Sequence, residues 1–483
     1  MRQGGRCWTL GSGLALVLAL AGCTSVPEFM QVSLPLPSEA GLDAQPSKAA
    51  ERESARILAS YGGIYENPKL QAIIVKTVAR LVAASEQPEL KYQVTVLNSP
   101  AINAFALPNG HIYVTRGLVA LANDEAELAS VLSHEMGHVI ARHGAIREEQ
   151  ARQAAIVAHV VTDVLDDPAA GALALAKSKL TLANFSRAQE LEADGIGVGI
   201  SARAGYDPYG AARMLRQMQR SADLKAGKNG SDPRALDFLS SHPATPERIK
   251  NALENAKQYA SAGERDHNDY LDALDGAVYG EDPSEGLVRG RRFIHGRLGF
   301  TFTAPPNFVL DNTAQAVLGL KGEGNEALRL DVVNVPAEQT LVAYLSSGWI
   351  ENVDHASVEE TTINGFPAAT ATATGDGWSF RLYVIRYGSD AYRFIFATKQ
   401  RSIESDRAFR ESVQSFRRMS LEEAEKVQPL HLAVATVLPG DTSEKLARRM
   451  AVADHALDSF RLINGLVSNE TLATGRKVKL IVE

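Results

Sequence analysis

Two histidines four residues apart provide the clearest chemical signal in the chain. The motif His-Glu-Met-Gly-His begins at His134, has its glutamate at Glu135 and ends at His138. Apolar residues recur at helical spacing across 124–142, which predicts a helix with one buried face. Because side chains four positions apart on a helix lie one above the other, both imidazoles can reach the same zinc ion. Glu135 then lies close enough to take a proton from a water molecule that the zinc polarises.

A zinc site built on this motif needs a third protein ligand, for which two arrangements are known. One places a histidine six residues after the second motif histidine, where this chain has Gly144; His143 is one residue out of register. The other uses a glutamate from a second helix. Glu190 fits that arrangement, and Asp194 shares its helix face and can accept the free ring N–H of a ligand histidine. Taken alone, these two carboxylates fit a solvated acidic helix face better than a metal site, because acidic residues are common on surfaces.

Four segments between residues 50 and 257 resemble the signatures of the HtpX, BepA and CAAX-prenyl-endopeptidase family of zinc metallopeptidases. They follow the family's order and lie at 103–115, 133–138, 186–194 and 241–249. Members such as HtpX are integral membrane proteins, whereas the apolar stretch 154–165 of this chain is too short and too charged to span a bilayer. We interpret that stretch as a helix packed over the active site, either a lid or a core helix.

The resemblance implies roles for individual side chains. One zinc ion per chain would be bound by three of them, His134, His138 and Glu190. Glu135 would act as general base and then as general acid, and Asp194 would orient a ligand histidine. We place His242 with the catalytic residues, as a gate or a support for the oxyanion; the alternative is a loop histidine that caps a helix. His143 is expected to be structural.

A short strand is expected to present the substrate. Its residues are Gly110, His111, Ile112, Tyr113 and Val114. An extended polypeptide could pair with such a strand by strand addition, which recognises the backbone more than the side chains. That mode of binding would suit a protease of unfolded proteins. The ring of His111 is expected to have a structural role.

Periodicity and turn signals predict a multidomain α+β chain. A mainly helical zincin catalytic domain with a small strand layer is expected at 50–265, followed by a glycine-rich linker at 266–291. An α+β domain with period-two strands follows at 292–419, and its role is open. The last segment, 428–483, is predicted to be a small βααβ module similar to LysM. LysM modules bind glycans that contain N-acetylglucosamine, so peptidoglycan is a candidate partner.

The N-terminus carries a predicted export signal. A positively charged start and an apolar run at 10–21 predict a signal peptide over 1–22, because the run is too short for a membrane span. The run ends in Leu-Ala-Gly followed by Cys23, which resembles a bacterial lipobox, so Cys23 is expected to carry lipid. The stretch 23–49 is then a tether, and Thr24 after the cysteine favours the outer membrane.

These features predict a zinc-dependent endopeptidase of the bacterial cell envelope, anchored in the inner leaflet of the outer membrane and facing the periplasm. Its partners would be misfolded or unassembled envelope polypeptides, the membrane and peptidoglycan. The formal net charge of -7 argues against nucleic acid. The alternative is a non-catalytic, lipid-anchored assembly factor or peptidoglycan-binding scaffold with a structural or latent zinc site. A permanent fourth ligand, His242, would favour that alternative.

Overall fold

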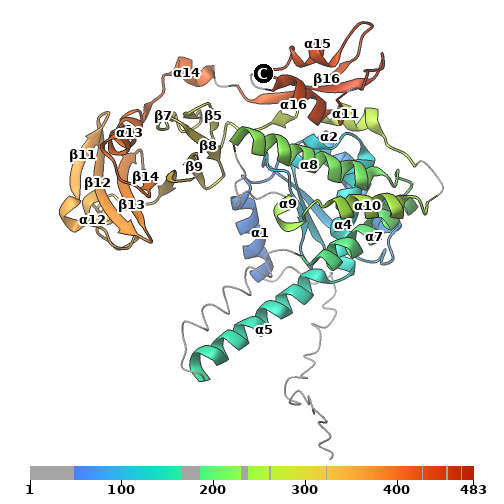
Figure 1. Cartoon of the computed structure of the whole chain (residues 1–483), viewed down its shortest axis with the longest axis horizontal. Coiled ribbons are helices and arrows are strands. Elements are labelled where there is room, and N and C mark those ends of the chain that lie inside the picture. Colours follow the sequence, from blue (N-terminus) through green and yellow to red (C-terminus); the bar gives the residue numbers. More distant parts are fainter. Residues whose placement is uncertain are drawn as a thin grey trace, which may run out of the picture. The chain divides into compact units, whose positions relative to one another are not determined.

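A computed structural model describes most of the chain after the expected tether (Figure 1). The described residues are 48–164, 185–229, 238–259, 263–322, 324–426, 428–452, 455–468 and 470–483. The expected signal peptide, Cys23 and nearly all of the tether lie outside them. Residues 45–483 form one compact unit. No helix in the described ranges has both the length and the apolar composition that a bilayer crossing requires.

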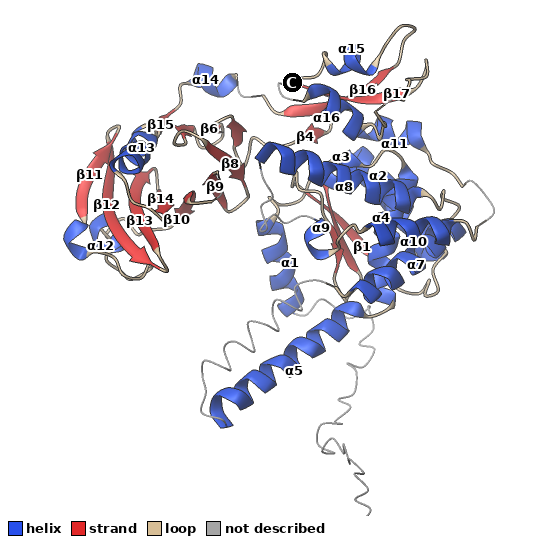
Figure 2. Cartoon of the chain, viewed as in Figure 1, coloured by secondary structure: helices blue, strands red, loops and turns tan. Residues whose placement is uncertain are grey.

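The first part of this unit is mainly helical and contains one small sheet, which agrees with the predicted architecture of the catalytic domain (Figure 2). Its elements are α1 (Lys48–Ser60), α2 (Pro68–Ala83), β1 (Gln93–Leu97), β2 (Ala104–Ala106), β3 (His111–Thr115), α3 (Arg116–Leu121), α4 (Glu125–Ile140), α5 (His143–Val164), α7 (Arg187–Arg203), α8 (Gly210–Asn229), α9 (Phe238–Ser241), α10 (Pro246–Ala256) and α11 (His267–Leu274).

The order of strands in the small sheet corrects one prediction. The sheet has the order β1-β3-β2, with β3 parallel to β1 and antiparallel to β2. The strand predicted to bind substrate, Gly110–Val114, is therefore the central strand, and its backbone pairs with protein on both sides. Because strand addition requires unpaired N–H and C=O groups, the prediction for this strand is wrong. The edge nearest the metal motif is β2.

Local sequence explains why the two site helices begin where they do. Asp124 precedes α4, and its carboxylate accepts a hydrogen bond from the Glu127 N–H at 2.8 Å. Ser186 precedes α7 and forms a capping box with Gln189, each side chain accepting a backbone N–H of the other. Such caps satisfy amide groups that a helix start leaves without partners. The two caps therefore fix the residue at which each helix begins.

The predicted α+β domain contains two antiparallel sheets. Their orders are β15-β7-β6-β5 and β11-β12-β13-β14-β10-β9-β8. The helix α13 (Ile403–Gln414) buries the side chains of Phe409 and Val413. The elements are β5 (Leu287–Arg289), β6 (Arg292–His295), β7 (Phe300–Thr303), β8 (Phe308–Asn312), β9 (Ala316–Lys321), β10 (Glu326–Val333), α12 (Leu341–Leu345), η2 (His355–Ser357), β11 (Glu359–Ile363), β12 (Phe366–Gly375), β13 (Trp378–Tyr387), β14 (Asp390–Thr398), α13 (Ile403–Gln414), β15 (Arg417–Arg418) and α14 (Leu421–Glu425).

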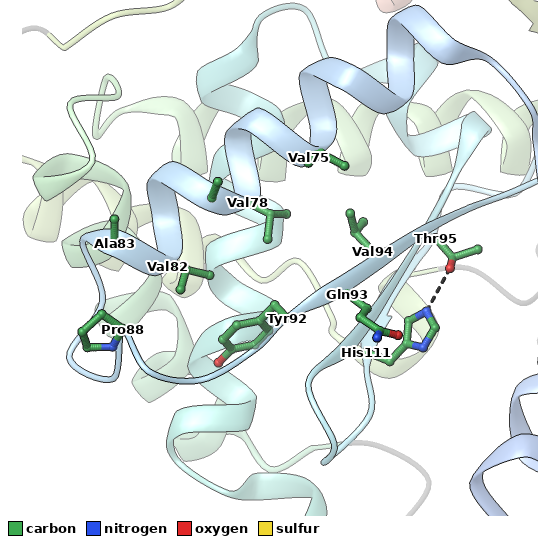
Figure 3. Close-up of a pocket in the computed structure, with 11 residues that line it drawn as sticks. Val75, Val78, Val82, Ala83, Pro88, Tyr92, Gln93, Val94, Thr95 and His111 are labelled. Carbon is green, nitrogen blue, oxygen red and sulfur yellow. Dashed lines mark hydrogen bonds between the residues drawn. The ribbon is translucent and has the colours of Figure 1, made fainter. Parts of the chain in front are cut away.

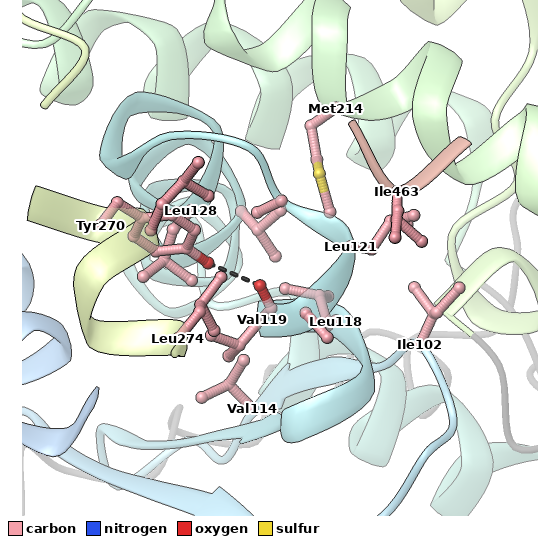
Figure 4. Close-up of a cluster of buried hydrophobic side chains, with 14 of the residues drawn as sticks. Ile102, Val114, Leu118, Val119, Leu121, Leu128, Met214, Tyr270, Leu274 and Ile463 are labelled. Atoms are coloured by element: carbon pink, nitrogen blue, oxygen red, sulfur yellow. Dashed lines mark hydrogen bonds between the residues drawn. The ribbon is translucent and has the colours of Figure 1, made fainter. Parts of the chain in front are cut away.

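The last segment has the predicted strand-helix-helix-strand order. Its elements are β16 (Leu430–Thr436), α15 (Ser443–Ala447), α16 (Ala456–Ile463) and β17 (Lys477–Val482). β16 pairs with β17 and also with β4 (Val278–Tyr279), a strand inside the segment that we expected to be a linker. That segment also contains α11, whose Tyr270 and Leu274 are buried in the same core as Ile463 (Figure 4). The stretch 266–291 is therefore largely packed structure, and the C-terminal module shares a core with the catalytic helices.

Candidate metal centre

Four buried side chains bring metal-binding atoms together inside the helical part. His134 and His138 come from α4, Glu190 comes from the first turn of α7, and His242 follows α9. One ligand atom from each lies within 4.8 Å of every other. The structure thus brings the three predicted zinc ligands together and adds His242 to them.

The distances between these atoms suit a single tetrahedral ion. The Nε2 atoms of His134 and His138 are 3.1 Å apart, and the Nε2 atom of His138 is 3.5 Å from Oε1 of Glu190. The Nδ1 atom of His242 is 2.8 Å from that same oxygen and 3.4 Å from Nε2 of His134. Ligand atoms about 2.0–2.1 Å from a tetrahedral zinc ion would be about 3.3 Å from one another. The observed separations scatter around that value.

The protonation of His138 and Glu190 also fits zinc. Burial lowers the pKa of His138 to about 3, so this imidazole is neutral and keeps a lone pair for a metal. Burial acts to raise the pKa of Glu190, but its contacts with His138 and His242 outweigh burial and hold the pKa below its usual value. Glu190 is therefore a carboxylate. Neutral imidazoles and a carboxylate are the donors that zinc prefers in catalytic sites.

Asp194 and Arg248 support the cluster from behind. Asp194 Oδ1 lies 3.0 Å from the Nδ1 atom of His134, where it can orient that ring. Arg248, on α10, donates to both oxygens of Asp194, at 2.8 Å and 2.7 Å, and its Nη1 atom is 2.7 Å from Oε2 of Glu190. Burial acts to raise the pKa of Asp194, but the hydrogen bonds from Arg248 outweigh it and lower the pKa. We assigned no role to Arg248 from the sequence, although it lies in the matched segment 241–249.

Glu135 lies beside the cluster with one oxygen held and the other available. Its Oε2 atom accepts a hydrogen bond from the Ala106 N–H of β2 at 3.1 Å. Its Oε1 atom is buried, has no hydrogen-bond partner among the described residues, and lies 3.9 Å from Nε2 of His242. Burial raises the pKa of Glu135. A carboxylate with a raised pKa and a free buried oxygen is suited to accept and return a proton.

Local structure explains where His242 lies. The single-turn helix α9 precedes it, and the His242 N–H donates to the carbonyl of Phe238 at 2.8 Å. The ring of Phe238 stacks on the His242 ring with centroids 4.6 Å apart. Thr245 then caps α10, which begins at Pro246. His242 therefore lies at the start of the short loop between α9 and α10, and its ring turns inward to the cluster.

The predicted site residues on β3 belong to a different region. The Nε2 atom of His111 is 2.9 Å from the Thr95 hydroxyl, and the His111 ring stacks on that of Tyr113 with centroids 4.2 Å apart. His111 lines a hollow of about 860 Å³ formed with α2 and β1, where Val78 and Val94 also lie (Figure 3). The metal-binding residues are not part of this lining, so the hollow is separate from the cluster. The predicted lid stays a prediction, because α5 ends at Val164 in a stretch whose side chains fall outside the described set.

Comparison with known proteins identifies the domain that holds the cluster. Residues 66–256 match the model of peptidase family M48. The chain is 33% identical over 181 residues to mitochondrial metalloendopeptidase OMA1 of Schizosaccharomyces pombe, covering 38% of this chain and 51% of that protein. It is 33% identical over 224 residues to a putative beta-barrel assembly-enhancing protease of Vibrio cholerae, with coverage of 44% and 45%. For the beta-barrel assembly-enhancing protease of Escherichia coli, identity is 28% over 204 residues, 40% of each chain.

The chain spans about half the length of these relatives or less. Within the matched segment lie all four clustered donors and the motif glutamate. The chain therefore carries a zinc metallopeptidase domain of family M48. This confirms the family expected from the four sequence segments.

Proposed function

We propose that the chain is a zinc-dependent endopeptidase that cleaves misfolded or unassembled proteins of the bacterial cell envelope. One observation carries the proposal: His134, His138 and Glu190 converge from two helices, with the free oxygen of Glu135 beside them. Two relatives are named as beta-barrel assembly-enhancing proteases, one of them putatively, which supports a substrate among envelope proteins.

The chemistry follows from the arrangement of the side chains. Zinc held by the three ligands would supply Lewis acidity to a water molecule and to the scissile carbonyl. Glu135 takes the proton of that water at Oε1 and later returns it to the leaving amine, while the Ala106 N–H keeps the other oxygen in place. Arg248 and Asp194 hold Glu190 and His134 against rotation. Fixed ligands reduce the reorganisation that the reaction requires.

The edge strand β2 is the place where an extended substrate would pair. The Leu107 N–H and the Asn103 carbonyl bond to β3, at 2.9 Å each. Because backbone groups alternate along a strand, Ala104 and Ala106 direct theirs away from β3. The Ala106 N–H donates to Glu135, so a polypeptide added at this edge would run past the general base. Recognition through the backbone would allow many sequences, as a protease of unfolded chains requires.

The location we propose rests on the sequence. The lipobox-like run at Cys23 would anchor the chain in the inner leaflet of the outer membrane, facing the periplasm. The C-terminal module could add contact with peptidoglycan, in keeping with its βααβ order.

The test is a paired measurement of metal and cleavage. Glu135→Gln removes the proton acceptor and keeps the shape of the side chain. We expect the variant to bind one zinc ion per chain, because Glu135 is not a ligand, and to cleave casein roughly 10²–10⁴-fold more slowly than wild type. Glu89→Gln, at an exposed position, is the control and should cleave at the wild-type rate. Equal cleavage by Glu135→Gln and wild type would overturn the proposal.

The competing function is a non-catalytic scaffold with a closed zinc site. The observation that favours it is the position of His242 among the donors, since four protein ligands are typical of structural zinc. The two functions differ in what removal of His242 does to zinc content and cleavage.

A further inference from the structure

A third histidine of the motif region lies directly behind one of the ligands. His143 is 2% exposed, and its Nδ1 atom is 2.9 Å from the Nδ1 atom of His138. This contact is on the side of the His138 ring opposite Nε2, the atom that points to the other donors. His143 therefore touches the ligand without being part of the donor set.

The turn between α4 and α5 places His143 there. On an unbroken helix, a residue five positions on would lie about 140° round the axis from His138. Here α4 ends with Ala141 as its cap, and Arg142 adopts a left-handed conformation with φ of 57°. α5 begins at the next residue, and His143 comes back over the ring of His138.

The carboxylate of Glu192, which contacts His143 on the side away from His138, sets the direction of the two hydrogen bonds. The Nε2 atom of His143 lies 3.3 Å from Oε2 of Glu192, and an ionised carboxylate can only accept. A neutral His143 therefore carries its proton on Nε2, which leaves Nδ1 with a lone pair. That lone pair accepts the Nδ1–H of His138, so the lone pair of His138 is on Nε2 and faces the cluster. In this series of hydrogen bonds from Glu192 through His143 to His138, each ring nitrogen has the protonation that metal binding through His138 Nε2 needs.

We propose that His143 is a positioning residue that, together with Glu192, fixes the tautomer and the ring angle of His138 for metal binding. Asp194 lies in the corresponding place behind His134, so each motif histidine has its own acceptor. The inference rests on the proposed function in one respect, that the cluster binds zinc. Partners of this kind change metal affinity by about 10–100-fold when they are removed.

The test measures metal affinity rather than cleavage. His143→Leu fills the space but cannot accept a hydrogen bond, so we expect zinc to bind about 10–100-fold more weakly in a chelator competition. The visible spectrum of the cobalt-substituted variant should shift, because the angle of the His138 ring changes. His143→Gln offers a carbonyl oxygen to the His138 N–H and should recover most of the affinity. His355→Leu, at an exposed histidine of η2, is the control and should bind zinc as wild type does.

Glu192 provides a second variant that does not disturb the core. Its side chain is 61% exposed, so Glu192→Leu should fold even where His143→Leu does not. We expect Glu192→Leu to weaken zinc binding in the same direction, to a smaller extent, because His143 loses its fixed tautomer. Wild-type affinity and cobalt spectrum in Glu192→Leu and in any folded His143→Leu would overturn the inference. If wild-type protein itself bound no zinc, the proposed function would fail instead, which separates the two failures.

Discussion

At the scale of single residues, His242 decides whether the zinc site is open or closed. Its Nδ1 atom lies 2.8 Å from Glu190 and 3.4 Å from His134, so the arrangement offers four protein donors. A tetrahedral ion with four protein ligands leaves no position for water. In the endopeptidase that we propose, His242 would therefore have to move away before water could bind the metal.

Removal of this imidazole should open the site. We expect His242→Ala to keep one zinc ion per chain, because three protein ligands are the usual number in catalytic zinc sites. Its rate of casein cleavage should equal or exceed that of wild type, since water gains a position. Metal analysis and a cleavage assay on the same preparation measure both. Loss of zinc together with loss of activity would instead identify His242 as a permanent structural ligand.

The residues that a local pattern could identify are those with helical spacing. His134 and His138, and likewise Glu190 and Asp194, are four positions apart, and the structure brings both pairs to one centre. Arg248 and the contact of His143 were not predicted. The reach of Arg248 depends on how α10 packs on α7, and that of His143 depends on the left-handed Arg142. Neither tertiary packing nor a single backbone angle is visible in residue spacing.

At the scale of elements, two glycines let α4 and α7 approach closely. A Cβ atom on Gly197 would lie 2.9 Å from the backbone nitrogen of His134, and one on Gly137 would lie 2.9 Å from the carbonyl oxygen of Ala193. Both neighbours are backbone atoms and cannot rotate away. This close approach is what allows Glu190 of α7 to reach the histidines of α4.

A methyl group at this contact should separate the helices. We expect Gly197→Ala to lower the free energy of unfolding by about 1–3 kcal/mol, as overpacking does, and to weaken zinc binding. Gly195→Ala is the matched control on the same helix, because its Cβ would meet only the Asn255 side chain, at 3.8 Å. That variant should be unchanged or up to about 1 kcal/mol more stable, through helix propensity. Urea denaturation and chelator competition compare the two variants. Equal effects of Gly197→Ala and Gly195→Ala would show that the close contact between α4 and α7 is unimportant.

The order of the strands in the small sheet could not be predicted from the residue pattern within each strand. The strand β3 was predicted at 110–114, and both it and its neighbour β1 form. Their order in the sheet depends on which segments meet in three dimensions, and the short strand β2 at Ala104–Ala106 takes the edge that we had assigned to β3. The strand predicted to bind substrate therefore has no unpaired edge, and we propose β2 in its place.

At the scale of the whole described unit, one buried lysine joins the C-terminal module to the catalytic helices. Lys479 of β17 is 0% exposed, and its Nζ atom donates to the carbonyls of Ala120 and Ala122 at 2.7 Å each. These carbonyls lie at the C-terminal end of α3, a few residues before Asp124, which caps α4. Asn464 holds the backbone of Lys479 on both sides, at 2.9 Å and 2.7 Å. The module thus satisfies carbonyl groups that a helix end leaves without partners.

This connection explains why the predicted domain limits were too simple. A strand-helix-helix-strand pattern at the end of a chain is typical of an independent module, and the elements do form in that order. Its packing partners come from far along the sequence, however, as Lys479 and Ala120 are 359 residues apart. Contacts at such separation cannot be predicted from composition shifts, which led us to interpret 266–291 as a linker.

The lysine should also give the protein a characteristic dependence of stability on pH. Burial lowers the pKa of Lys479 to about 7, with Glu127 and Asp124 opposing the effect, whereas in the unfolded chain the pKa is about 10.4. Between these two values the unfolded chain binds more protons than the folded one, so stability rises with pH across that window. A neutral amine still has two N–H groups for the two carbonyls at 2.7 Å.

Substitution of Lys479 tests both its hydrogen bonds to the two carbonyls and its effect on the pH dependence of stability. Lys479→Met leaves the two carbonyls without a donor, at a cost of about 1–3 kcal/mol for each buried group. We expect the variant to be less stable than wild type at pH 9, and the difference to shrink toward pH 6, where wild type carries the cost of a buried charge.

Lys477→Met, two residues earlier on β17, removes only a partly exposed pair with Asp272 and should cost at most about 1 kcal/mol at every pH. Urea denaturation at pH 6, 7, 8 and 9 measures the slopes. If wild type and Lys479→Met had parallel pH profiles, the lysine would not be the titrating group that couples the module to the catalytic helices.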